Sequence, residues 1–201
     1  MFSLTEQNER EMASMLKLKV IIASTRPGRV GPAVAEWFVE RAKAHGAFDV
    51  ELVDLAEVDL PVFDEPEHPA AQKYQNEHTK KWSAVVDSAD AFVIVTPEYN
   101  YGTPPSLVNA LTYLYNEWNY KPAGFVSYGG ISGGLRSAQM TKLILNTLKV
   151  VPLTEAVTLP LVWNQLSEAG AFVPNDANAE AADGMLDELQ KWAEALKPMR
   201  A

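Results

Sequence analysis

Residues 18–31, LKVIIASTRPGRVG, decide the fold that we expect of this chain. Leu18 to Ala23 is a short, mostly apolar run, typical of a strand that is buried on both faces. Ser24 to Gly31 follows as a polar loop, and Pro32 suits the first turn of a helix that we expect over residues 32–44. A buried strand that leads directly into a helix favours a parallel sheet with helices on its faces.

The alternation of strand and helix continues to the end of the chain. Further strands are expected over residues 48–54, 91–95, 123–127 and 151–159, and further helices over residues 77–89, 105–118, 134–148 and 180–196. Five strands with right-handed crossovers predict an α/β three-layer sandwich, in which a five-stranded parallel sheet has the flavodoxin-like order 2-1-3-4-5. We expect one domain over residues 17–201, preceded by a flexible extension over residues 1–16.

The composition disfavours several classes of protein. The chain has 26 acidic and 17 basic residues and a net charge of −9, the opposite of what nucleic-acid phosphates attract. It has no cysteine, and its three histidines lack metal-ligand spacing, so we expect no disulfide and no metal site. No run of about 18 apolar residues occurs, and Met1 to Met15 lacks the apolar core of a signal peptide. We therefore expect a cytoplasmic protein with no membrane insertion and no nucleic-acid partner.

Three loops contain the residues that are best suited to bind a ligand, and each of these loops follows an expected strand. In a parallel sheet of this order, ligands bind beyond the carboxyl ends of the strands, at the switch point between strands 1 and 3. The loops after strands 1, 3 and 4 are therefore expected to converge. Each loop alone is also compatible with an ordinary turn. The prediction of a binding site depends on their coincidence at one edge of the sheet.

The first loop, Ser24 to Gly31, has the features of an anion site. Free backbone N–H groups and the positive end of the helix dipole favour an anion at a helix N-terminus. Ser24 and Thr25 add hydroxyl donors, while Arg26 and Arg29 add charge and forked donors. The loop matches neither G-x-G-x-x-G nor a P-loop, which disfavours a dinucleotide-binding fold or an ATPase. We expect it to bind a terminal phosphate.

The second and third loops offer groups that suit a flat heterocycle. In the second loop, Thr96 to Pro105, the tyrosines Tyr99 and Tyr101 provide aromatic surface and Asn100 provides hydrogen-bonding groups. The third loop, Ser127 to Gly134, has four glycines in eight residues, which permits the close approach of a flat ligand.

These segments resemble those of the NADPH-dependent FMN reductases, a family that includes flavin, quinone, azo-dye and chromate reductases. The resemblance runs from about Lys17 to Thr158, and its most specific part is the segment 97–100. It implies non-covalently bound FMN, NADPH or NADH as co-substrate, and a small-molecule electron acceptor. By this resemblance, the phosphate is held by Ser24, Thr25, Arg26, Gly28, Arg29, Val30 and Gly31, and the isoalloxazine ring is lined by Pro97, Glu98, Tyr99 and Asn100 and by Ser127, Tyr128 and Gly129.

The resemblance implies a reductase in which the flavin carries the hydride chemistry, so we expect no dedicated catalytic residue. Two alternatives remain. A non-enzymatic flavodoxin-type electron carrier fits the acidity and the fold, although the tyrosine-bearing loop at residues 97–100 favours the reductase. A structural or regulatory α/β domain without flavin is the other alternative.

The expected helix over residues 105–118 carries more apolar and aromatic surface than one buried stripe needs. Together with the resemblance, this surplus predicts a homodimer or homotetramer that uses this helix, whereas complete burial in the core is the alternative. The residues concerned are Leu107, Leu111, Tyr113, Leu114, Tyr115 and Trp118.

Overall fold

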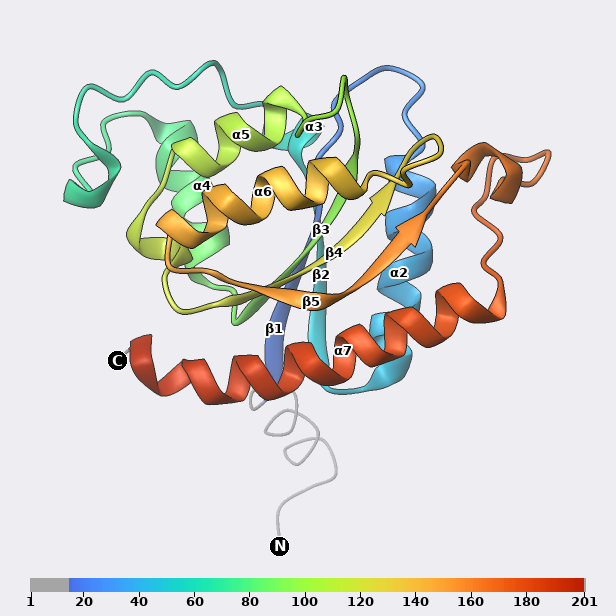
Figure 1. Cartoon of the computed structure of the whole chain (residues 1–201). Helices are drawn as coiled ribbons and strands as arrows, with labels where there is room; N and C mark the ends of the chain where they lie inside the picture. The colour runs from blue at the N-terminus through green and yellow to red at the C-terminus, as the bar shows by residue number, and fades with distance from the viewer. Residues whose placement is uncertain (1–14, 201) are drawn as a thin grey trace, which may run out of the picture.

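The computed structural model describes residues 15–200, and its centre is a five-stranded sheet (Figure 1). The strands lie in the order β2-β1-β3-β4-β5, and each neighbouring pair is parallel. The predicted sheet order is therefore confirmed. The strands are β1 (Leu16–Ile22), β2 (Phe48–Asp54), β3 (Ala91–Pro97), β4 (Pro122–Tyr128) and β5 (Val151–Leu159).

Helices cover both faces of this sheet (Figure 1). One face packs against α2 (Gly31–His45) and α7 (Asp176–Leu196), and the other packs against α4 (Glu77–Asp87), α5 (Pro105–Thr112) and α6 (Leu135–Thr147). None of the helices described within residues 15–200 has the length and apolar character that crossing a membrane requires. Short helical turns complete the chain: α3 (Leu55–Val58), η1 (Pro69–Ala71), η2 (Asn116–Trp118), η3 (Val162–Gln165) and η4 (Lys197–Arg200).

The first strand contributes to two separate cores. Val20 belongs to the cluster under α2 and α7, whereas Ile21 belongs to the cluster under the helices of the opposite face. Both side chains are at most 2% exposed. The mostly apolar run at residues 18–23 therefore has the physical cause expected of it, because each face of a central parallel strand is covered.

Element boundaries differ from expectation at both ends of the chain. β1 begins at Leu16, inside the range 1–16 that was expected to be an extension, while residues 1–14 of that extension lie outside the described residues. The terminal helix begins at Asp176 instead of residue 180. The reason is a capping box, in which Asn175 accepts a hydrogen bond from the N–H of Asn178 and the Asn178 side chain accepts one from the N–H of Asn175.

The helix expected over residues 105–118 ends at Thr112, and its surplus of apolar surface does not exist. Tyr115 leaves the helical conformation at φ −135°, and the Glu117 carboxylate accepts a hydrogen bond from its N–H at 3.3 Å. Trp118 then packs on Phe92, with ring centroids 4.9 Å apart. Five of the six apolar residues are at most 1% exposed within the chain itself, so the premise for an interface on this helix was wrong. These five are Leu107, Leu111, Tyr113, Leu114 and Trp118.

Candidate functional site

The three loops of interest lie together at the carboxyl edge of the sheet (Figure 1). The hydroxyls of Ser24 and Tyr99 are 2.6 Å apart, which joins the loops after β1 and β3. The Glu98 carboxylate accepts from the Ser132 hydroxyl at 2.8 Å and from the Arg136 backbone N–H at 3.1 Å, which joins the loops after β3 and β4. The structure thus confirms that these loops converge.

The loop after β1 presents unpaired donors at the start of α2. The helix begins at Gly31, and its cap residue Val30 makes no side-chain capping bond. Within residues 15–200, the backbone N–H groups of Thr25, Gly28 and Val30 have no acceptor, and the exposed Arg26 side chain has no hydrogen bond or ion pair. Uncapped N–H groups at the positive end of a helix dipole favour an anion.

Arg29, by contrast, is already paired. Its guanidinium binds the Asp54 carboxylate with both nitrogens, of which Nη1 lies 2.6 Å from Oδ1, and Nη1 also donates to the Ser24 carbonyl at 2.6 Å. Of the two loop arginines, Arg26 is therefore the one whose charge is available. Sequence reasoning missed Asp54, because it lies 25 residues from Arg29 and no local pattern connects the two.

Tyr128 places a buried hydroxyl beneath the same loop. The residue is 5% exposed, and its Oη has no hydrogen-bond partner within the described chain. A Cβ on Gly31 would lie 2.9 Å from this oxygen, so the glycine is required for the tyrosine to pack under α2. Burial raises the pKa of Tyr128, and the neighbouring Tyr99 adds to the rise, so the hydroxyl remains a neutral donor. The Ser24 side chain and the Gly31 N–H lie beside the hydroxyl and oppose this rise, but neither meets hydrogen-bond geometry with it. The buried O–H therefore still lacks an acceptor within the described chain, which a ligand atom would supply.

The loop after β3 contains a tight turn made by two residues in the left-handed region. Tyr99 and Gly102 exchange backbone hydrogen bonds of 3.0 and 2.9 Å, and Asn100 and Tyr101 between them have φ of 50° and 69°. These values define a type I′ turn. The Asn100 amide makes no hydrogen bond within residues 15–200, and the 72%-exposed Tyr101 carries the Arg136 guanidinium 3.8 Å above its ring. The turn therefore presents an amide and an aromatic ring at the edge of the loop cluster.

Glu98 connects the loop after β3 to the loop after β4. Its side chain is 9% exposed and forms an ion pair with Arg136 in addition to the two hydrogen bonds described above. Burial alone would raise the pKa of Glu98, but the bonds from Arg136 and Ser132 outweigh burial and lower it, so the group is ionised near neutral pH. Its position at the N-terminus of α6 is also favourable for a carboxylate. Ser132 and Arg136 were not among the predicted site residues.

The third loop needs its last glycine for its own packing. Gly134 has φ 82°, and a Cβ there would lie 2.7 Å from both the N and the O of Tyr128. Ser127 is buried, and the N–H of Gly129 donates to the Leu159 carbonyl at 3.3 Å. The glycines therefore let the loop fold closely onto the ends of β4 and β5. The approach of a flat ligand to this loop stays a prediction.

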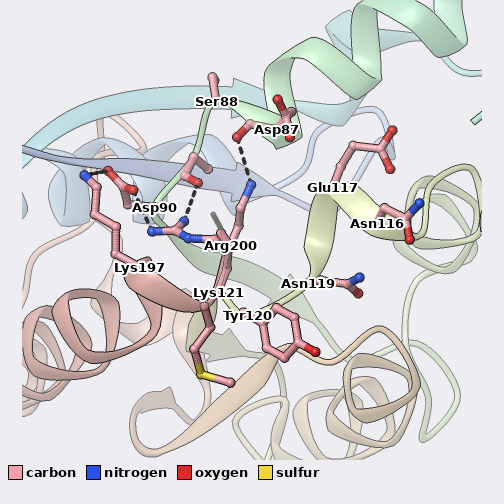
Figure 2. Close-up of a pocket in the computed structure, with 12 residues that line it drawn as sticks. Asp87, Ser88, Asp90, Asn116, Glu117, Asn119, Tyr120, Lys121, Lys197 and Arg200 are labelled. Atoms are coloured by element: carbon pink, nitrogen blue, oxygen red, sulfur yellow. Dashed lines mark hydrogen bonds and ion pairs between the residues drawn. The ribbon is translucent and has the colours of Figure 1, made fainter.

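Two cavities are alternative candidates for the functional site. The first has a volume of about 770 Å³, runs between α3 and α5, and reaches the loop after β1 at Thr25. The second has a volume of about 530 Å³ and lies at the opposite, amino edge of the sheet, between the end of α4, η2 and η4 (Figure 2).

The basic side chains that line the cavity at the amino edge are each bonded within the chain. Lys121 Nζ donates to the Val86 and Asp87 carbonyls at 2.8 and 2.9 Å, which caps the last turn of α4. Arg200 and Lys197 both bind the Asp90 carboxylate (Figure 2), at distances of 2.8 and 3.2 Å. These contacts account for the charges structurally, so we place the candidate site at the three loops.

Comparison with known proteins identifies the family and the fold. The family model for NADPH-dependent FMN reductases matches residues 16–164. An NAD(P)H-dependent FMN reductase of Schizosaccharomyces pombe is 40% identical over 189 residues, which cover 90% of this chain and 94% of the relative. A quinone reductase of Pseudomonas putida is 28% identical over 189 residues, with 90% and 96% covered. In fold, the chain is similar to the flavoenzyme FerB, an NAD(P)H:(acceptor) oxidoreductase from Paracoccus denitrificans, with a TM-score of 0.73 at 20% identity over 90% of this chain and 99% of that one.

Proposed function

This chain belongs to the NADPH-dependent FMN reductase family, and we propose that it is an NAD(P)H-dependent reductase that holds FMN at the three loops and passes electrons to a small acceptor. The observation that carries the proposal is the set of donors around the loop after β1 that have no partner within residues 15–200. They are free N–H groups at an uncapped helix start, the Arg26 side chain and the Tyr128 hydroxyl. When bound, FMN supplies the capacity to accept a hydride and to donate electrons.

The loop at residues 24–31 fits a phosphate monoester in number and kind of donors. Its N–H groups and the first turn of α2 suit the phosphate oxygens, and the Arg26 guanidinium adds a forked charge. The hydroxyls of Ser24 and Thr25 lie on the same loop, and Tyr128 Oη would gain the acceptor it lacks. A neutral ligand would leave the charge of Arg26 unused, so the donor set favours an anion.

Residues 97–100 and 127–129 form the proposed surface for the isoalloxazine ring. Asn100 offers its unpaired amide to the polar edge of a heterocycle, and Tyr99 offers an aromatic face beside Ser24. Glu98 holds the two loops together through Ser132 and Arg136. Because its carboxylate is ionised and paired, Glu98 is a poor proton donor. These residues therefore bind and orient, and we propose no catalytic acid or base.

Quinones and azo compounds are the acceptors that the names of the relatives suggest. The Pseudomonas putida relative is named a quinone reductase, and a flat acceptor would suit the exposed ring of Tyr101 at the rim of the loops. The second candidate function is a flavodoxin-type electron carrier, which shares the fold and the acidic charge.

The decisive experiment is to purify the protein, record the visible absorbance of oxidised flavin, and mix it anaerobically with NADH or NADPH. A reductase is yellow and bleaches rapidly, after which an added quinone restores the colour. Very slow bleaching would favour the carrier. A colourless protein that binds no added FMN would refute both functions.

We also propose a homodimer, or a homotetramer built from it, with the contact on α6 instead of α5. Five large apolar side chains along α6 and in the loops beside it are exposed, which is typical of an interaction surface. They are Tyr101, Ile131, Leu135, Met140 and Leu143, with exposures of 45–91%. Leu143→Glu should give a monomer by light scattering, whereas Trp192→Glu, an exposed apolar position on α7, should not. A monomeric wild-type protein at micromolar concentration would refute the assembly.

A further inference from the structure

Asp54 connects the ends of β1 and β2 through Arg29. In the register of the sheet, Asp54 is the partner of Ile22, and each is the last residue of its strand. Asp54 therefore lies beside the residue at which the loop after β1 leaves the sheet. It accepts from both terminal nitrogens of Arg29. Because a guanidinium and a carboxylate pair in a fork, the contact fixes the orientation of both side chains.

This pair fixes two residues of the proposed phosphate loop, Ser24 at its start and Arg29 near its end. Arg29 Nη1 also donates to the Ser24 carbonyl, so residues 24 and 29 are held to each other. Asp54 is itself fixed, because its Oδ1 accepts from the Ala56 N–H at 2.9 Å as the cap of α3. Between the two fixed residues, the exposed segment 25–28 forms a short arch that carries the free Arg26 side chain.

The same geometry argues against Arg29 as a direct ligand of the phosphate. The side chains of Arg29 and Asp54 are only 18% and 12% exposed. If Arg29 moved to an anion, the Asp54 carboxylate would be left partly buried and unpaired, with its negative charge beside the phosphate. Both consequences are unfavourable. Arg26 has no such competing partner within residues 15–200.

We propose that Asp54 is a positioning residue for the FMN phosphate, which acts by holding Arg29 and thereby the shape of residues 24–29. A loop that is already in its binding shape loses less conformational entropy when the anion binds, and therefore binds it more tightly. Arg26 supplies the charge for the phosphate, and Arg29 supplies the shape of the loop. This inference rests on the proposed function, because it assumes that FMN binds here.

The test is to titrate the full chain, stripped of flavin, with FMN and with riboflavin, which lacks the phosphate. The variants are Asp54→Asn, Arg29→Gln and the double variant. Asp54→Asn keeps an acceptor for the Ala56 N–H, so the cap of α3 is retained. We expect each single variant to weaken FMN by about tenfold and riboflavin by less than about twofold, since only the phosphate uses the loop. The double variant should be no weaker than either single one, because the two residues act as one unit.

Several results would overturn the inference. If Asp54→Asn binds FMN more tightly, Arg29 is a direct ligand that Asp54 restrains. If FMN and riboflavin weaken equally, or if neither changes, Asp54 does not act on the phosphate. Arg29→Lys keeps the charge but not the fork, so wild-type affinity in this variant would also contradict a positioning role. A wild-type chain that binds no FMN would instead refute the proposed function itself.

Discussion

The two edges of the sheet differ in how their polar groups are satisfied. At the amino edge, Lys121, Lys197 and Arg200 line a cavity, and each is bonded to a carbonyl or to Asp90 (Figure 2). At the carboxyl edge, the Arg26 side chain and the Tyr128 hydroxyl have no partner within the described chain. Paired charges stabilise a fold, whereas unpaired donors indicate a ligand. The buried Trp118 Nε1 on η2, near the amino edge, also lacks a partner within residues 15–200. The gathering of several free donors in one loop, and not a single orphan atom, therefore marks the carboxyl edge as the ligand site.

At the amino edge, the buried Lys121 should make the free energy of unfolding depend on pH. Burial lowers the pKa of Lys121 from 10.5 to about 8. Between these two pH values the unfolded chain keeps the proton that the folded chain has lost, so the free energy of unfolding should rise with pH, by on the order of 3 kcal/mol in total. Lys121→Met should abolish this rise. Urea unfolding at a series of pH values measures it.

The matched control for this prediction is Lys149→Met, because Lys149 is exposed. This variant should keep the wild-type rise. FMN affinity should be unchanged in both variants, since neither residue lies near the three loops. An identical pH slope in wild type and Lys121→Met would show that the Lys121 amine is not held in a costly environment.

Substitutions at the carboxyl edge should change the affinity for FMN. Arg26→Gln removes the free guanidinium and should weaken FMN by about 1.5–3 kcal/mol, the usual cost of a hydrogen bond to a charged group. Riboflavin binding should hardly change, because riboflavin has no phosphate. Fluorescence titration with the two flavins measures both affinities.

Arg200→Gln provides the comparison at the amino edge, where the arginine is bonded to Asp90 and the Ala89 carbonyl. It should lower the melting temperature and leave FMN affinity unchanged. If Arg26→Gln lowered stability while Arg200→Gln lowered FMN affinity, the roles assigned to the two edges would be reversed.

The fold was predictable because its signals are local. The mostly apolar run at residues 18–23 marks a central strand. The handedness of crossovers limits the possible topologies, and five strands in a chain of this length suit the order 2-1-3-4-5. The convergence of the three loops follows from that order without any knowledge of side-chain contacts. The candidate loops could therefore be found from the sequence alone.

The pairing of charges within the site could not be predicted. Arg29 and Asp54 are 25 residues apart, and Glu98 and Arg136 are 38 apart, so no helical or strand period connects them. Which arginine remains free depends on these pairs. The same limit explains the error about residues 105–118, because burial of Trp118 requires knowing that the chain turns at Tyr115 and packs on Phe92.

A smaller effect is expected from the hydroxyl of Tyr99. Tyr99→Phe removes the 2.6 Å bond to Ser24 but keeps the aromatic ring. A neutral hydrogen bond contributes about 0.5–1.5 kcal/mol, so FMN affinity should fall by roughly twofold to tenfold. Tyr120→Phe, beside the cavity at the amino edge, should leave FMN affinity unchanged. Equal effects of the two variants on FMN would remove Tyr99 from the site.

The smallest effect concerns the backbone, because both edges contain residues in the left-handed region. Asn100 at the carboxyl edge has φ 50°, and Lys149 at the amino edge has φ 54°. Glycine adopts this conformation without strain, so either substitution should change the free energy of unfolding by less than about 1 kcal/mol. Asn100→Gly removes an amide without disturbing the turn, whereas alanine would add strain and confuse the two effects.

The flavin should then distinguish the two positions. Asn100→Gly should shift FMN affinity or the rate of reduction by NAD(P)H by about two- to tenfold, as expected for one lost neutral hydrogen bond, whereas Lys149→Gly should alter neither. Single-turnover reduction and FMN titration, measured beside melting temperatures, separate these outcomes. If Asn100→Gly leaves binding and reduction unchanged, its amide does not contact the flavin, and the turn at residues 99–102 owes its conformation to folding alone.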